Sequence, residues 1–378
     1  MSKRAKRILY LCSTLKSCGP INQLRYIIKG LDRQKYEPFV LTLSPEALDT
    51  AQSEIAGLGV EIESLGLSRG ACILLGAQRL RQVLSRIEPD LLHSSGFRPD
   101  ILTGGMVGDI PTVATLRNFP FHDYPMKFGR LLGCWMALKH STVLPKFNAV
   151  VPCSHSIAGL FGPSNFNVHV IQNGIDTEFF CLSSQARRHQ IRSEWGIGQG
   201  KRVFVTSGSL MPRKDPLTLI RAFRKFSSVT TDHLFVLGDG PLFAACQKEA
   251  LAQERVHLLG HVGDVRPYLQ GADYFVSAAH SEGLPNAVME AMACGLPVAL
   301  SDIPSHREQV QPSPLVGELF PVGDEVGLVG CLERLVKFER KHRSEAAVAL
   351  VDQYFCARKM SLAYQTLYSS LLDGNRES

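Results

Sequence analysis

Apolar runs of four to seven residues recur along most of the chain, and stretches with hydrophobic residues at helical spacing separate them. In the first half, the expected strands cover residues 8–14, 39–43, 60–65, 90–95, 111–116 and 149–154. In the second half, they cover residues 203–207, 234–237, 256–259, 274–277 and 297–300. Apolar strands that alternate with helices are typical of parallel sheets covered on both faces. The pattern therefore predicts an α/β protein with two doubly wound parallel sheets.

A polar and basic stretch over residues 183–200 interrupts this alternation, and we interpret it as a linker. The 378 residues fit two domains, since a domain typically holds about 100–200 residues. We therefore expect an N-terminal domain over 1–180 and a C-terminal domain over 181–352, with a cleft between the two sheets. Aromatic and aliphatic residues at helical spacing over 353–373 predict a terminal amphipathic helix.

The composition, 45% hydrophobic and 20% charged, is that of a globular protein and excludes a disordered or fibrous chain. The ten cysteines form no Cys-x-x-Cys pair, and several lie inside apolar runs, among them Cys12, Cys153 and Cys294. This usage is typical of small buried thiols in a reducing compartment. The apolar runs are shorter than the ~20 residues that cross a bilayer, and the first is too short for a signal peptide. We therefore expect a cytoplasmic protein.

The net charge of +6 is unevenly distributed along the chain. Residues 1–180 hold 19 Lys and Arg against 14 Asp and Glu, whereas residues 181–378 hold 22 against 21. A basic excess suits an anionic substrate, nucleic acid or an anionic membrane face, and equally an ordinary solvated surface. No RGG, zinc-finger or RNP-like pattern accompanies it, so we expect no nucleic-acid partner.

The segment over residues 127–140 combines basic and large apolar side chains. Its cations are Lys127, Arg130 and Lys139, and several leucines, a phenylalanine and a tryptophan lie between them. One interpretation is that this segment docks peripherally at the inner face of a membrane. The other is that it is a core-facing helix that covers the first sheet.

Candidate chemistry lies where strands of the second half end, because ligands bind at the carboxyl ends of strands in open parallel sheets. The strand over 203–207 is followed by Gly208 and then by Arg213 and Lys214 near a helix start. A glycine lets the backbone approach a diphosphate closely, and two cations neutralise its oxygens. The alternative is an ordinary surface turn with a solvated Arg-Lys pair. The next strand ends in Gly-Asp-Gly-Pro at 238–241, which predicts a tight turn.

Two glutamates, Glu282 and Glu290, lie eight positions apart around the start of a short predicted helix. Pro285 suits the first helical position, and Gly295 suits its end. The N–H groups of a helix start bind anions, whereas carboxylates bind hydroxyl groups. The arrangement therefore suits a ligand with a phosphate centre and polyol ends, such as a nucleotide sugar. The alternative is that Glu282 is a capping or solvated acid and that Glu290 lies on the helix surface.

The run from residue 281 to residue 298 resembles the E-x7-E signature of the retaining glycosyltransferases of family 4. Those enzymes have the GT-B fold, in which two Rossmann-like domains surround a cleft. The resemblance covers most of the chain: 208–215 is similar to the donor-diphosphate segment, 259–265 to the segment that lines the nucleotide base, and 170–180 to the interdomain segment. It also implies that the helix over 353–373 crosses back to the first domain.

The resemblance implies roles for the charged residues of the second half. Glu290 would bind the ribose hydroxyls of the donor. Lys214 would bind the diphosphate, assisted by Arg213. Glu282 would lie at the donor sugar as a catalytic residue.

Other donor contacts follow from the same resemblance. The backbone N–H groups of Gly283 and Leu284 would approach the phosphate, and Gly19 would approach the distal phosphate from the first strand end. His261 and Val262 would line the base. The chain departs from the family pattern at Gly19, where many members have two glycines. It also has a serine at position 209, where many members have arginine.

Two strand ends of the first half carry further candidates. His93 ends one strand, and Arg117 follows another at a place where the family often has histidine. We consider both as catalytic residues, and His122 and Asp123 as acceptor contacts. A lone histidine is, however, often structural or solvated.

The resemblance implies a retaining, metal-independent transfer of a hexose or N-acetylhexosamine. The donor would be a nucleotide-diphosphate sugar, and the acceptor a glycan or lipid-linked glycan in surface polysaccharide biosynthesis. No Asp-x-Asp pair suggests a metal site, and no cofactor besides the donor is expected. The alternatives are a sugar-nucleotide epimerase of the same fold and a non-catalytic nucleotide-sugar-binding protein. A dehydrogenase is disfavoured because no Gly-x-Gly-x-x-Gly follows the first strand.

Overall fold

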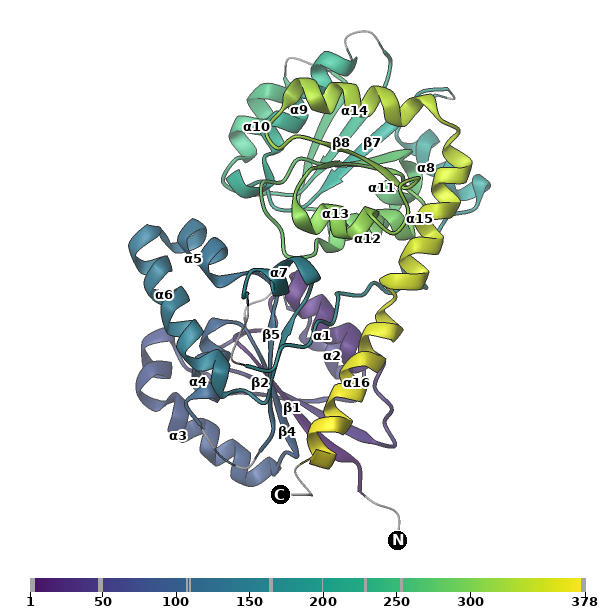
Figure 1. Ribbon diagram of the computed structural model, residues 1–378. Coiled ribbons are helices and arrows are strands. Elements are labelled where there is room, and N and C mark those ends of the chain that lie inside the picture. Colours follow the sequence, from purple (N-terminus) through teal and green to yellow (C-terminus); the bar gives the residue numbers. More distant parts are fainter. Residues whose placement is uncertain are drawn as a thin grey trace. The chain divides into compact units, whose positions relative to one another are not determined.

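The computed structural model describes residues 4–46, 50–106, 108, 110–162, 166–198, 200–227, 230–251 and 254–374. The chain forms two compact units: unit 1 is Met1–Gly174 with Ala357–Ser378, and unit 2 is Ile175–Cys356. Each unit contains one six-stranded sheet in which every recorded strand pair is parallel. The two doubly wound sheets that the hydrophobic pattern predicts are thereby confirmed (Figure 1).

The sheet of unit 1 has the strand order β3-β2-β1-β4-β5-β6. Its strands are β1 (Lys6–Cys12), β2 (Tyr36–Thr42), β3 (Glu61–Ser64), β4 (Leu91–Ser95), β5 (Thr112–Leu116) and β6 (Ala149–Pro152). Its helices are α1 (Gly19–Lys29), α2 (Gln52–Ala56), α3 (Arg69–Ile87), α4 (Phe97–Gly104), α5 (Pro120–Phe128), α6 (Arg130–Val143), α7 (His155–Gly159) and α16 (Ala357–Gly374), with a 3-10 turn η1 (Leu144–Lys146). Figure 1 shows α1, α2 and α16 on one face of this sheet and α3, α4 and α6 on the other.

Helix α16 packs on α1 although more than 300 residues separate them in sequence. The Ser361 hydroxyl donates a hydrogen bond to the Ile27 carbonyl at 2.7 Å. A Cβ atom added to Gly30 would lie 2.6 Å from the Ser361 Cβ, so the glycine permits this close approach. Tyr364 and Tyr368 of α16 are fully buried. The C-terminal helix is therefore part of the core of unit 1.

The sheet of unit 2 has the order β12-β11-β10-β7-β8-β9. Its strands are β7 (Val203–Ser207), β8 (His233–Leu237), β9 (Val256–Gly260), β10 (Tyr274–Ser277), β11 (Val298–Ser301) and β12 (Gly317–Phe320). Its helices are α8 (Gln185–Glu194), α9 (Pro216–Ser227), α10 (Phe243–Ala250), α11 (Arg266–Gly271), α12 (Asn286–Ala293), α13 (Pro304–Val310), α14 (Glu325–Lys337) and α15 (Arg340–Tyr354), with a 3-10 turn η2 (Pro212–Lys214). The pattern of apolar runs misses β12, because this edge strand has four residues and only two of them are apolar.

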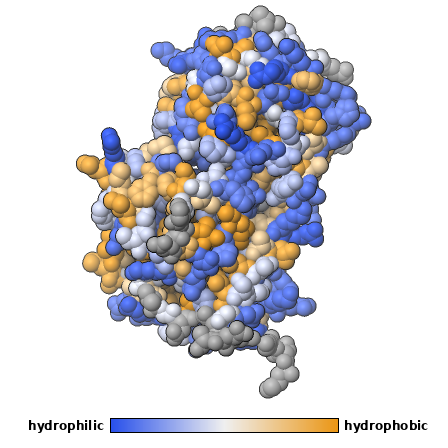
Figure 2. Space-filling model, viewed as in Figure 1, coloured by the Kyte–Doolittle hydropathy of each residue, from blue (hydrophilic) through white to orange (hydrophobic). Residues whose placement is uncertain are grey.

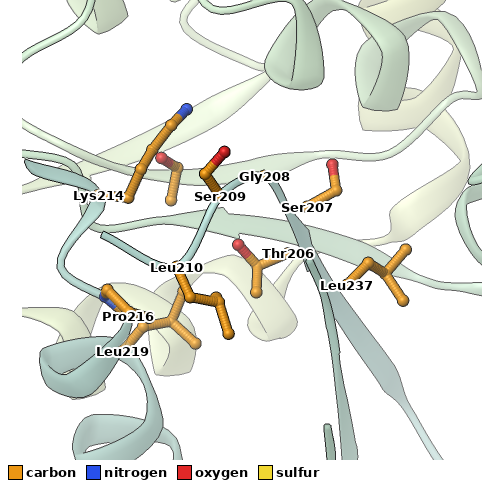
Figure 3. Close-up of a pocket in the computed structure, with 10 residues that line it drawn as sticks. Thr206, Ser207, Gly208, Ser209, Leu210, Lys214, Pro216, Leu219 and Leu237 are labelled. Carbon is orange, nitrogen blue, oxygen red and sulfur yellow. The ribbon is translucent and has the colours of Figure 1, made fainter. Parts of the chain in front are cut away.

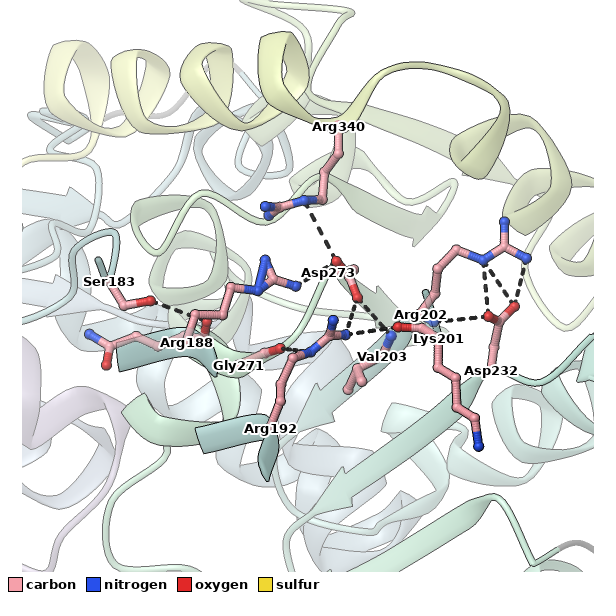
Figure 4. A network of polar contacts seen from close by, with 11 residues as sticks. Ser183, Arg188, Arg192, Lys201, Arg202, Val203, Asp232, Gly271, Asp273 and Arg340 are labelled. Atoms are coloured by element: carbon pink, nitrogen blue, oxygen red, sulfur yellow. Dashed lines mark hydrogen bonds and ion pairs between the residues drawn. The ribbon is translucent and has the colours of Figure 1, made fainter. Parts of the chain in front are cut away.

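The expected linker over 183–200 is wrong, because it contains helix α8. Ser184 caps this helix by accepting a hydrogen bond from Arg187 N at 3.2 Å. Ile191 is its one buried residue. Arg188 and Arg192 each lie 2.5 Å from the carboxylate of Asp273, the residue just before β10 (Figure 4). Ion pairs thus help to attach helix α8 to the sheet, and a hydropathy pattern does not reveal them.

The segment over 127–140 also differs from the expectation of one core-facing helix. It belongs to two helices, α5 and α6, which are separated by Gly129 with φ of 81°. The apolar side chains that the pattern emphasises are exposed, among them Leu131, Trp135 and Leu138. Within the described part of the chain, no helix combines the length and the apolar character that crossing a bilayer requires.

Candidate active site

Glycines at three strand ends of unit 2 lock neighbouring loops together. Gly238 N donates to the Gly260 carbonyl at 2.7 Å, and Gly208 N donates to the Leu237 carbonyl at 2.9 Å. Gly208 and Gly238 have φ values of 138° and 139°, which side chains rarely adopt. A Cβ atom on Gly238 would lie 1.9 Å from the Gly208 carbonyl oxygen. Gly238, the first glycine of the predicted Gly-Asp-Gly-Pro turn, therefore has a structural role: it positions the loop that follows β7.

A pocket opens at this edge of the sheet, over the end of β7 (Figure 3). It is lined by Thr206, Ser207, Gly208, Ser209, Leu210, Lys214, Pro216, Leu219, Leu237 and Ser277. Lys214 ends the turn η2, and the following Asp215 adopts a left-handed conformation with φ of 46°. The Asp215 carboxylate accepts a hydrogen bond from Thr218 N at 3.3 Å, at the start of α9. This turn holds the Lys214 side chain beside Gly208 at the pocket.

Glu282 brings the two cations of this turn together. Its Oε2 atom lies 2.7 Å from Arg213 Nη1, and its Oε1 atom contacts Lys214 Nζ. Only 7% of the Glu282 side chain is exposed. Burial by itself would raise the pKa of Glu282, but the neighbouring Lys214 and Arg213 charges and hydrogen bonds hold this pKa below its usual value. Glu282 is therefore an ionised carboxylate between two cations.

The loop from Gly283 to Pro285 is buried and is held from α13. Gln309, on that helix, donates a hydrogen bond from Nε2 to the Pro285 carbonyl at 3.0 Å. Helix α12 begins at Asn286, and Pro285 is its N-cap rather than its first residue. The predicted position of Pro285 is thus wrong by one residue. Gln309 belongs to no motif, so its role in holding the loop is not predictable from the sequence.

Glu290 lies in the second turn of α12 and is half-buried. Burial raises the pKa of Glu290 to about 7, although the Lys214 charge acts in the opposite direction. The ammonium of Lys214 therefore acts on both carboxylates of the E-x7-E pair. The structure brings Arg213, Lys214, Glu282 and Glu290 into one electrostatically coupled group.

His261 and Val262 lie in the loop after β9, where His261 is exposed and Val262 is half-buried. In the same loop, Asp264 forms an ion pair with Arg266 at 2.7 Å. The Arg266 guanidinium lies 3.7 Å from the ring centroid of Phe179. These contacts fix the end of the loop and leave the His261 side chain at the surface.

In unit 1, His93 is buried in the middle of β4 rather than at its end, and both of its ring nitrogens have protein partners. Nδ1 lies 2.7 Å from the Tyr368 hydroxyl, and Nε2 lies 2.7 Å from Thr115 Oγ1. Burial, together with the charge of Arg117, lowers the pKa of His93 to about 3. A neutral imidazole with both nitrogens occupied connects β4, β5 and α16 and has no nitrogen available for a substrate.

Arg117 follows β5, and its guanidinium donates to the side-chain oxygen of Asn173. Arg117 and His93 both line a pocket of about 240 Å³ in unit 1, together with residues of β1 and α1. Pro20 and Cys18, which flank Gly19, line the same pocket. Gly19 is the first residue of α1.

His122 and Asp123 lie in the first turn of α5. His122 is exposed, and its ring contacts that of Phe119 with 5.0 Å between the centroids. Asp123 is buried and forms an ion pair with Lys127 at 2.8 Å. Of the two residues expected to contact the acceptor, His122 is therefore exposed and Asp123 is not. Among the described residues, no group of three or more His, Cys, Asp or Glu is arranged to hold a metal ion.

Two family models match the chain. Residues 19–179 match the model of Glycosyltransferase Family 4, and residues 201–337 match that of Glycosyl transferases group 1. The chain belongs to glycosyltransferase family 4. The E-x7-E resemblance is thus confirmed, and the coupled group in unit 2 belongs to a glycosyltransferase.

Relatives and solved structures are similar to this glycosyltransferase over much of its length. It is 25% identical to the O-antigen biosynthesis glycosyltransferase WclY of Escherichia coli, over 97% of this chain and 98% of that protein. It is 26% identical to the UDP-Gal:alpha-D-GlcNAc-diphosphoundecaprenol alpha-1,3-galactosyltransferase of Escherichia coli, over 68% of each chain. The structure of Anabaena HepE in complex with UDP superposes with a TM-score of 0.81 at 18% identity, and covers 96% of this chain and 100% of that chain. The glycosyltransferase therefore has the GT-B fold.

Proposed function

We propose that this glycosyltransferase moves a hexosyl or N-acetylhexosaminyl group from a nucleotide-diphosphate sugar to a glycan or lipid-linked glycan in surface polysaccharide biosynthesis. The observation that carries the proposal is the coupled group at the edge of the unit 2 sheet. Arg213 and Lys214 supply positive charge beside the Gly208 backbone, where a diphosphate fits. Glu282 and Glu290 supply carboxylates for the hydroxyls at the two ends of such a donor.

The names of the relatives support the donor and acceptor classes. The galactosyltransferase relative is named for UDP-Gal and for a diphosphoundecaprenol-linked GlcNAc. HepE has been solved with UDP and with UDP-glucose. WclY is named for O-antigen biosynthesis. By analogy, we propose a nucleotide sugar as the donor of this chain and a polyprenyl-linked glycan as its acceptor.

The proposed reaction retains the anomeric configuration and uses no divalent cation. The bond between the anomeric carbon and the diphosphate oxygen breaks, and the acceptor oxygen forms its bond on the same face of the sugar. The departing diphosphate oxygen takes the proton of the acceptor hydroxyl. Arg213 and Lys214 stabilise the charge that develops on the diphosphate. Glu282 accepts a hydrogen bond from a donor-sugar hydroxyl and is not the nucleophile.

We assign the acceptor to unit 1. Arg117 lines the pocket of about 240 Å³ there, and His122 is exposed nearby in sequence on α5. His93 then has a positioning role, because hydrogen bonds to Tyr368 and Thr115 occupy both of its nitrogens.

The test is a thermal-shift and turnover screen over UDP-, GDP- and ADP-sugars in the presence of EDTA. One donor should raise the melting temperature of the wild type, while Lys214→Ala and Glu290→Ala should lose most of that shift and at least about tenfold in turnover. Lys248→Ala, which removes an exposed lysine of α10, is the matched control. NMR of the product should show the anomeric configuration of the donor. Unchanged donor binding and turnover in both variants would contradict the proposed site, and an inverted product would contradict retention.

A further inference from the structure

Helices α5 and α6 of unit 1 expose a set of large apolar side chains, which we call the α5–α6 face. The exposed fractions are 90% for Leu131, 57% for Trp135 and 59% for Leu138. The other exposed members are Phe121, Met126, Phe128 and Leu132. Figure 2 shows hydrophobic atoms gathered over the position of α5 and α6. A contiguous exposed patch of this kind marks an interaction surface.

The packing of the two helices keeps this face turned to solvent. A Cβ atom on Gly133 of α6 would lie 2.4 Å from the backbone of Pro125, so the two helices touch through the glycine. On the buried side of α6, His140 lies 3.0 Å from Asp100 Oδ2 and 2.8 Å from the Tyr124 hydroxyl. Asp100 also accepts a hydrogen bond from Ser94 of β4 at 2.6 Å. Because His140, Asp100 and Ser94 are buried, α6 cannot rotate its leucines inward without breaking these hydrogen bonds.

The exposed charges on the surrounding helices are of one sign. Helices α3, α4, α5 and α6 carry eight cations, namely Arg69, Arg79, Arg81, Arg86, Arg98, Lys127, Arg130 and Lys139. Their acidic residues are Asp100 and Asp123, and both are buried. Glu63, on β3, pairs with Arg86 at the far end of α3. Much of the basic excess of the first 180 residues therefore lies on these helices, with no exposed carboxylate among their side chains.

We propose that the α5–α6 face docks on an anionic lipid bilayer. Leucine, phenylalanine and tryptophan side chains enter the boundary between headgroups and acyl chains, and the flanking lysines and arginines contact anionic headgroups. The charge distribution argues against a second copy of the chain as the occupant. In a two-fold dimer, the same cations of both copies would meet across the contact. The inference rests on the proposed function in one respect: a lipid-linked acceptor would be presented at that bilayer.

The experiment is co-sedimentation of the full chain with vesicles of phosphatidylcholine and phosphatidylglycerol (7:3), and with phosphatidylcholine alone. The wild type should bind the anionic vesicles at least about tenfold more tightly, and this binding should weaken as NaCl is raised from 50 to 500 mM. The double variant Leu131→Ser/Trp135→Ser should lose at least about tenfold in vesicle affinity, as should Arg130→Glu/Lys139→Glu. Leu251→Ser is the matched control, because Leu251 is 82% exposed but lies in unit 2.

Tryptophan fluorescence reports vesicle binding by the wild type itself, so this measurement does not depend on whether the double variants fold. The chain has two tryptophans, and Trp195 is stacked against Tyr268 inside unit 2. A blue shift on addition of anionic vesicles that is absent in Trp135→Phe would support the proposal. Equal binding to both kinds of vesicle, or unchanged binding by both double variants, would overturn it. A concentration-dependent dimer that Leu131→Ser/Trp135→Ser abolishes would overturn it as well.

The donor-induced thermal shift distinguishes a failure of docking from a failure of the proposed function. The variants of the α5–α6 face should keep the full donor-induced rise in melting temperature, because the coupled group proposed to bind the donor lies in unit 2. A chain that binds donor but no vesicles refutes docking alone. A chain that binds vesicles but no nucleotide sugar refutes the proposed function alone.

Discussion

The guanidinium of Arg213 and the carboxylate of Glu282 form an ion pair, with 2.7 Å between Nη1 and Oε2. Lys214 contacts the other oxygen of the same carboxylate. The cations proposed to bind the donor diphosphate are therefore already paired with the residue proposed to bind the donor sugar. A diphosphate must share these cations with Glu282.

Glu282→Gln should tighten the binding of the nucleoside diphosphate by about three- to tenfold. The amide keeps the size of the side chain but no longer neutralises Arg213 and Lys214, so both become available to the phosphate oxygens. Turnover should fall by at least about 100-fold, since the sugar contact is weakened. Isothermal titration calorimetry with the nucleoside diphosphate of the identified donor measures the first effect.

The control for this experiment is Glu345→Gln, which changes an exposed glutamate of α15. It should leave both affinity and turnover at the wild-type level. An unchanged or weaker nucleoside-diphosphate affinity in Glu282→Gln would show that the carboxylate does not compete for the cations.

Donor affinity should increase as the pH rises from 6 to 8, with a midpoint near pH 7. The pKa of Glu290 is about 7 in the donor-free protein, so the carboxylate that accepts hydrogen bonds from ribose hydroxyls forms over this range. Glu290→Gln should bind donor weakly at every pH in the range. Calorimetric titrations at pH 6, 7 and 8 test this, and a wild-type profile parallel to that of Glu290→Gln would refute the assignment.

Glu290 should also make the stability of the donor-free protein depend on pH. Whereas donor affinity increases with pH, this stability should decrease. Between the ordinary pKa of glutamate, about 4.3, and about 7 in the fold, the native state holds a proton that the unfolded chain has lost. The contribution of Glu290 to the free energy of unfolding therefore decreases as the pH rises from 5 to 7.5. Urea denaturation should show a steeper decrease in the wild type than in Glu290→Gln.

Gly238→Ala should disrupt the donor site although residue 238 carries no chemical group. The added Cβ atom would lie 1.9 Å from the Gly208 carbonyl oxygen and would sit at a φ of 139°. The strand-end loop next to Lys214 must then shift, which should cost about 2–3 kcal/mol of stability and at least about tenfold in donor affinity.

Gly198→Ala is the matched control for this substitution, because a Cβ atom there has open space. Thermal melts and donor titrations of the two variants provide the comparison. Equal melting temperatures would mean that the loops at β7 and β8 do not depend on the glycine.

Regular elements with continuous apolar patterns were predictable from the chain alone. The predicted strands over 203–207 and 274–277 coincide with β7 and β10, because their burial is encoded by neighbouring residues. Helix α8 was missed because Asp273, about 80 residues away in sequence, anchors it through ion pairs. The sequence likewise did not determine which side of α6 faces the core, since either side of a helix with many apolar residues can do so.

The sequence by itself determined two parallel sheets, the positions of their strand ends and the spacing of Glu282 and Glu290 around a helix start. These features depend on local periodicity and on short motifs. Only the tertiary structure decided which partner each polar group has. It paired Glu282 with Arg213, 69 positions earlier, and occupied both nitrogens of His93 with Thr115 and Tyr368. Burial and ion pairing arise between segments distant in sequence, and they determine which carboxylate is ionised, which histidine stays neutral and which apolar face is left exposed.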